Sequence, residues 1–119
     1  MRAIETARDI SKALTEPGAR LRKGIPDVYD AYGAMSKAVI ADGALPAKTK
    51  ELVALAIAAT RECDGCISAH ARGAARQGAT EAEVAETMGV VIMMNGGPGT
   101  VWGPRALAAY REFATPDAE

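Results

Sequence analysis

The segment ECDGCISAH, residues 62–70, contains both cysteines of the chain and its only histidine. Cys63 and Cys66 are three residues apart, and His70 follows Cys66 by four. A thiolate attacks rather than a thiol, and a free thiol with a pKa of about 8.5 is only slightly ionised at neutral pH. An imidazole can accept the thiol proton and a second thiol can close a disulfide, so this spacing favours thiol redox chemistry.

Helical geometry gives the two cysteines different neighbours. If residues 63–77 form a helix, the Cα atoms of Cys63 and Cys66 lie about 5 Å apart, within the range of a disulfide. Cys66 and His70 then share one face a turn apart, whereas Cys63 and His70 are separated by about 10 Å along the axis. Cys66 therefore has the imidazole as its neighbour, and Cys63 can form a disulfide with Cys66.

Glu51 is the acid that we expect to orient His70. Asp64 is closer in sequence, but its helical phase points it away from the face that Cys66 and His70 share. If the chain reverses near residues 61–63, two antiparallel helices bring the Glu51 side chain to the level of His70. The alternative is a solvated acid at a helix start, where the helix dipole favours a negative charge.

Two other interpretations of the cysteine pair need to be weighed. Two thiolates, the imidazole and Glu51 would supply four zinc ligands, but three ligands on one helical face suit a tetrahedron poorly. The cysteines can also be two small buried residues of an alanine-rich core. The chain has no second cysteine pair, and we expect neither a metal nor a bound cofactor.

Composition predicts a single domain over residues 1–119. The formal net charge of −1 gives no attraction for nucleic acid or for an acidic membrane surface. No apolar run approaches the roughly 20 residues that cross a bilayer, and the N-terminal MRAIETARDISKAL lacks the apolar segment of a signal peptide. We expect a cytoplasmic protein, in which a cysteine pair is reactive rather than structural.

Hydrophobic periodicity predicts an all-α fold of about six helices. The expected helices cover residues 3–15, 27–41 and 45–62, a fourth from 63 to about 77, a fifth from the Thr80–Glu83 capping box, and a last one after the glycine-rich residues 95–100. Residues 20–26 are expected to be a loop, and residues 95–100 a turn between helices rather than a phosphate loop. The helix over 45–62 is apolar around much of its circumference, which indicates a central position or a subunit interface.

Residues 51–84, ELVALAIAATRECDGCISAHARGAARQGATEAEV, resemble the alkylhydroperoxidase D-like branch of the carboxymuconolactone decarboxylase family. The shared pattern is a glutamate, eleven residues, Cys-x-x-Cys-x-x-x-His, a Gly-Ala-Thr turn and an acidic helix start. The likeness extends over about residues 26–114. One position departs from well-studied members, which have a histidine directly before the second cysteine, where this chain has Gly65.

The resemblance implies an all-α homo-oligomer, a trimer or a hexamer, with peroxidase or general thiol–disulfide activity. Cys66 would then be the cysteine that attacks the peroxide, Cys63 the resolving cysteine, and His70 with Glu51 the proton relay. The implied partners are a small hydroperoxide and a dithiol reductant. The decarboxylase branch usually lacks the cysteine pair, but a lyase that uses Glu51 and His70 as an acid–base pair is the alternative.

Overall fold

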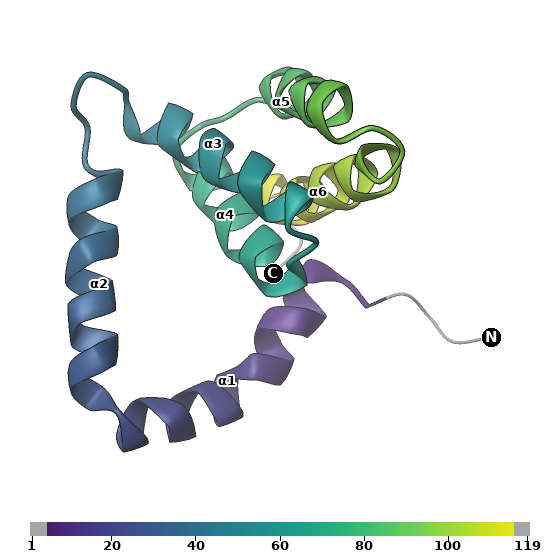
Figure 1. Cartoon of the computed structure of the whole chain (residues 1–119). Helices are drawn as coiled ribbons and strands as arrows, with labels where there is room; N and C mark the ends of the chain where they lie inside the picture. Colours follow the sequence, from purple (N-terminus) through teal and green to yellow (C-terminus); the bar gives the residue numbers. More distant parts are fainter. Residues whose placement is uncertain (1–4, 116–119) are drawn as a thin grey trace.

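The computed structural model describes residues 5–115, and within this range all regular structure is α-helical (Figure 1). The helices are α1 (Ala7–Gly24), α2 (Pro26–Ile40), α3 (Ala47–Thr60), α4 (Asp64–Arg76), α5 (Glu81–Asn95) and α6 (Gly99–Ala114). The predicted all-α fold is therefore confirmed. In the described range, no helix has both the length and the apolar character needed to cross a membrane.

Helices α3 to α6 form the body of the molecule. α3 and α6 each pack against both α4 and α5, and they also contact each other. The buried side chains are mostly small, which lets the helix backbones approach one another closely. The core consists chiefly of Leu55, Ala58, Ala59, Ile67, Ala71, Ala74, Val84, Met88, Val91, Ala106, Ala109 and Tyr110.

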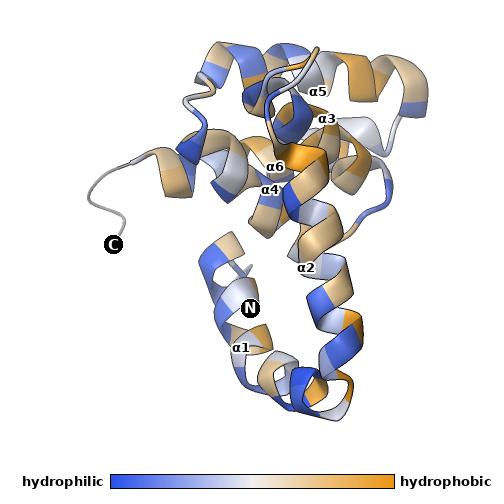
Figure 2. Cartoon of the chain, turned by 90° about the vertical axis from the view of Figure 1, so that its left-hand side faces the viewer, coloured by the Kyte–Doolittle hydropathy of each residue, from blue (hydrophilic) through white to orange (hydrophobic). Residues whose placement is uncertain are grey.

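Helices α1 and α2 form an arm that projects from this body (Figures 1 and 2). The helical spacing predicted for α2 is confirmed, but none of its side chains is buried. Its apolar stripe of Val28, Tyr32, Met35 and Val39 is 56% to 64% exposed. The arm therefore presents apolar surface that the chain itself does not cover.

The prediction for α1 is wrong at both ends. The predicted start includes residues 3 and 4, which lie outside the described residues; the helix itself begins at Ala7, after a capping box between Thr6 and Asp9. It was expected to stop at Glu-Pro-Gly and to be followed by a loop, yet it continues through Pro17 to Gly24. Pro17 removes one backbone hydrogen bond, and good helix formers on its C-terminal side sustain the helix, which curves along its length (Figure 1).

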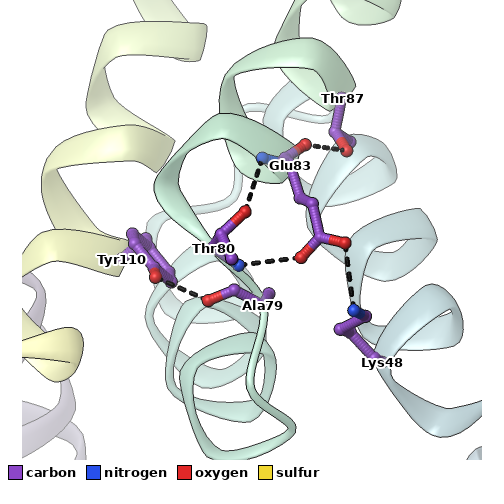
Figure 3. A network of polar contacts seen from close by, with 6 residues as sticks. All are labelled: Lys48, Ala79, Thr80, Glu83, Thr87 and Tyr110. Atoms are coloured by element: carbon purple, nitrogen blue, oxygen red, sulfur yellow. Dashed lines mark hydrogen bonds and ion pairs between the residues drawn. The ribbon is translucent and has the colours of Figure 1, made fainter.

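The predicted start of α5 is confirmed by a reciprocal capping box (Figure 3). The Thr80 Oγ1 accepts the Glu83 N–H at 3.1 Å, and the Glu83 Oε1 accepts the Thr80 N–H at 2.8 Å. The Thr80 N–H, and then the Lys48 ammonium 3.0 Å from Oε2, lower the pKa of Glu83 below its ordinary 4.5. The contacts of Glu83 therefore stabilise the fold above that pH, and this contribution is lost as the pH falls through the lowered folded pKa.

Tyr110 ties α6 to the turn before α5, because its buried hydroxyl donates to the Ala79 carbonyl at 2.6 Å (Figure 3). Burial, assisted by the negative charges of Glu81 and Glu83, raises the pKa of Tyr110 above 10. Its contribution to stability is thus complete below pH 10 and is lost as the pH rises through the raised folded pKa.

Tyr110→Phe is expected to lower the free energy of unfolding by about 1–2 kcal/mol at pH 7, since it leaves a buried carbonyl without its donor. Urea unfolding at pH 7 and pH 11 measures this difference, which should shrink at the higher pH. Tyr32→Phe is the matched control, because Tyr32 is 64% exposed. Equal effects of the two substitutions would contradict the role of the buried hydroxyl.

Candidate active site

The turn between α3 and α4 fixes the position of Cys63. The Glu62 N–H donates to the Ala59 carbonyl and the Cys63 N–H to the Ala58 carbonyl, each at 3.1 Å, and these two bonds end α3. Glu62 has a φ of +55°, in the left-handed region that such helix ends use. The chain reverses here, so α4 runs back along α3 as predicted (Figure 1).

Cys63 caps the start of α4, and its Sγ accepts the Cys66 N–H at 3.3 Å. The helix begins at Asp64, one residue after the predicted start. A disulfide joins Cys63 to Cys66, with their Cα atoms 5.3 Å apart, close to the expected spacing. Cys66 is exposed whereas Cys63 is half-buried, so Cys66 is the more accessible of the two to a molecule from solvent.

Glu51 and His70 meet across the α3–α4 interface, with Oε1 and Nδ1 2.7 Å apart. Glu51 lies on the first turns of α3 and its side chain is only 13% exposed, while that of His70 is 37% exposed. The contact predicted from antiparallel helices is therefore present. The interpretation of Glu51 as a freely solvated acid is wrong for this arrangement.

The hydrogen bond fixes the roles of the two imidazole nitrogens. When Glu51 is ionised its carboxylate can only accept, and the bond then requires that Nδ1 of His70 carries the hydrogen and donates it. In the neutral ring, Nε2 then keeps its lone pair and is the nitrogen that can take a proton. When it does, the Glu51 carboxylate stabilises the resulting positive charge, as in the carboxylate–histidine pairs of hydrolases.

Cys66 and His70 lie four residues apart on α4, about 6 Å along its axis. Within residues 5–115, the His70 ring forms its hydrogen bond with Glu51 and none with a sulfur. The residues thus form two adjoining pairs, Glu51 with His70 and Cys63 with Cys66.

His70 also lines a cleft of about 470 Å³ formed mainly by α2 and α3. The lining is largely apolar, and its polar side chains are those of Ser36, Lys50 and His70. The apolar lining residues are Met35, Val39, Ile40, Leu45, Val53, Ala54 and Ile57. This surface suits the apolar part of an organic molecule whose reactive group lies near the imidazole.

Lys50 attaches the end of α2 to α3 and lines this cleft. Its Nζ donates to the carbonyls of Val39 and Ala41 at 2.8 and 2.6 Å, which lie at the C-terminal end of α2. Neither Lys50 nor the cleft was predicted from the sequence. Two sequence features could have indicated them: the lysine directly before Glu51, and the apolar stripe of α2, which needs a partner surface.

Asp64 does face away from His70, and its Oδ1 lies 3.8 Å from Nη1 of Arg105 on α6. Across residues 5–115, no group of three or more His, Cys, Asp or Glu side chains is placed to hold a metal ion.

Comparison with known proteins identifies relatives over most of the chain. The model of the carboxymuconolactone decarboxylase family matches residues 26–112. An uncharacterized protein of Cupriavidus necator is 37% identical over 105 residues, which cover 86% of this chain and 93% of the relative. Uncharacterized protein 4 of the cox locus of Paracoccus denitrificans is 41% identical over 107 residues, covering 88% of this chain and 96% of the relative.

A solved structure has the same fold. The crystal structure of an apo carboxymuconolactone decarboxylase family protein from Legionella pneumophila superimposes with a TM-score of 0.87 at 37% identity. The superposition covers 92% of this chain and 97% of that one. With the family model spanning most of the sequence and the fold shared, the chain belongs to the carboxymuconolactone decarboxylase family.

Proposed function

We propose that the protein is a thiol-dependent peroxidase of the alkylhydroperoxidase D-like type, with Cys66, Cys63, His70 and Glu51 as its catalytic residues. The observation that carries the proposal is the pairing of Glu51 with His70 one helical turn from a cysteine that shares a disulfide. A cysteine pair needs a base to ionise the attacking thiol and a second sulfur to close the cycle. The first turns of α4 carry both cysteines and the histidine, which supports the proposal.

The cycle begins when His70 Nε2 takes the Cys66 proton through water. The Cys66 thiolate attacks the outer oxygen of a hydroperoxide, the O–O bond breaks, and Cys66 becomes a sulfenic acid. The leaving alkoxide takes the proton from His70 and departs as an alcohol. The Cys63 thiol then displaces hydroxide from the sulfenic acid, which gives the disulfide and water. A dithiol reductant reduces the disulfide and is itself oxidised.

The cleft beside His70 supports an organic hydroperoxide over hydrogen peroxide as the substrate. Its largely apolar lining lowers the free energy of a bound alkyl group by removing that group from water, whereas hydrogen peroxide has none to bury. The reductant is a small dithiol or a protein that carries one, because no other electron carrier is needed for the cycle.

We further propose that the protein acts as a homo-oligomer, a trimer or a hexamer, in the cytoplasm. The uncovered apolar stripe of α2 and the half-exposed Val53 and Ile57 of α3 support a second copy packing against this side of the molecule.

The test is the reaction of the reduced protein with cumene hydroperoxide in a stopped-flow instrument. One equivalent of peroxide should remove both thiols and yield one equivalent of the alcohol, at least about 100-fold faster than free cysteine reacts. A rate equal to that of free cysteine would contradict a peroxidase function.

A lyase remains the second candidate because one observation favours it. His70 lines the cleft, whereas neither cysteine does, so the Glu51–His70 pair could act on a bound substrate without the sulfurs. Release of carbon dioxide from a carboxymuconolactone by a variant with both Cys63→Ser and Cys66→Ser would favour this lyase. No release by the wild-type protein would exclude it.

A further inference from the structure

Gly73 occupies an unexpected place for a glycine, the interior of α4. Glycine destabilises a helix interior relative to alanine, because it loses more backbone freedom on folding. Gly73 does not have a positive φ, so the backbone conformation does not require a glycine here. The reason for its presence must lie in what a side chain would meet.

A side chain at position 73 would meet Glu51. A Cβ added to Gly73 would overlap all three atoms of the Glu51 carboxylate, both oxygens and the carbon between them. Gly73 follows His70 by three residues on α4, so the two positions lie on the same side of the helix. The Glu51 carboxylate therefore rests on bare helix backbone directly beside the imidazole that it contacts.

From this packing we infer that Gly73 is a positioning residue for the Glu51–His70 pair. The missing Cβ leaves a slot on α4 that admits the Glu51 carboxylate and keeps Oε1 within 2.7 Å of Nδ1. Gly73 acts only through Glu51 and is not itself catalytic. The importance of this slot for turnover rests on the proposed function, but its effect on the imidazole does not.

The overlap involves the far end of a flexible side chain, so the fold can accommodate a methyl group at position 73 if Glu51 moves. Gly73→Ala should therefore fold, with the Glu51 carboxylate displaced from His70. The expected signature is a protein of undiminished stability whose histidine has lost its partner. A merely structural glycine would give the opposite result, a loss of stability with the histidine unchanged.

The experiment uses nitrogen-15 NMR of His70, whose signals are unambiguous because the chain has no other histidine. In the wild-type protein the hydrogen-bonded Nδ1–H should be observed, and in Gly73→Ala it should be lost. Gly89→Ala is the matched control, since Gly89 lies inside α5 with no atom within 4 Å of an added Cβ, and it should leave the signal unchanged. An unchanged Nδ1–H signal in Gly73→Ala would overturn the inference.

Thermal unfolding adds a readout that remains decisive if Gly73→Ala folds poorly. In a Glu51→Ala background the overlapping carboxylate is absent, so Gly73→Ala should raise the unfolding midpoint. A midpoint that falls equally in both backgrounds would overturn the assignment of Glu51 as the group that needs the slot.

The peroxide assay separates this inference from the proposed function. If Gly73 positions Glu51 and the protein is a peroxidase, Gly73→Ala should react with cumene hydroperoxide at least about tenfold more slowly than the wild-type protein. Gly89→Ala should react at the wild-type rate. Loss of the Nδ1–H signal with an unchanged rate would support the slot and contradict the proton relay.

Discussion

Cys66→Ser is expected to abolish the reaction of the reduced protein with an organic hydroperoxide, lowering its rate constant by at least about 1,000-fold. Cys66 is exposed at the start of α4 and is one turn from His70, which is the base proposed to ionise it. A serine hydroxyl in the same place is a far weaker nucleophile toward a peroxide oxygen, and no neighbouring group compensates. Stopped-flow measurement of thiol loss and of alcohol formation checks this expectation.

Cys63→Ser is the matched variant, because it removes the other sulfur of the same disulfide. It should keep the first step and stop at the Cys66 sulfenic acid, which a dimedone reagent traps and mass spectrometry detects. The sulfur of Cys63 is half-buried and serves as the cap of α4, which suits a resolving cysteine better than an attacking one. If Cys63→Ser were the unreactive variant and Cys66→Ser the reactive one, the two roles would be reversed.

Local signals in the sequence predicted the bounds of α2, α3 and α4 to within one or two residues. The Thr80–Glu83 capping box begins α5, and Gly78, with a φ of +82°, follows the end of α4 as a C-terminal cap. The same logic failed at Pro17, because proline raises the free energy of a helix without forbidding it. Whether α1 continues past Pro17 depends on the helix-forming free energies of all its residues together. A single residue that disfavours a helix does not determine that sum.

The Glu51–His70 and Cys63–Cys66 pairs were also predictable, and for a geometric reason. Cys66 and His70 share one helix, and Glu51 reaches His70 because a short turn makes α3 and α4 antiparallel. The cleft was not predictable, since it depends on where α2 lies relative to α3, which the Lys50 hydrogen bonds help to set. The role of Gly73 was hidden for a similar reason, because it depends on the separation of two packed helices.

Glu51→Gln is expected to slow the reaction with peroxide by about 100-fold near pH 7 while leaving the fold intact. Glutamine has nearly the same shape, so it can occupy the slot beside Gly73, but it carries no charge. Without the carboxylate, the imidazolium formed when His70 takes the Cys66 proton is no longer stabilised. The amide can also donate to Nδ1, which would place the ring hydrogen on Nε2 and remove the lone pair proposed to accept the thiol proton.

The pH dependence of the Glu51→Gln variant tests this explanation against simple misfolding. The defect should shrink as the pH rises past about 8.5, where an ordinary thiol ionises without a base. Glu86→Gln, which changes an exposed acid of α5, is the control and should match the wild-type protein at every pH. A defect in thiol ionisation should disappear at a pH where the thiol ionises without a base. A Glu51→Gln defect of the same size from pH 6 to pH 9 would therefore show that Glu51 does not act through proton transfer.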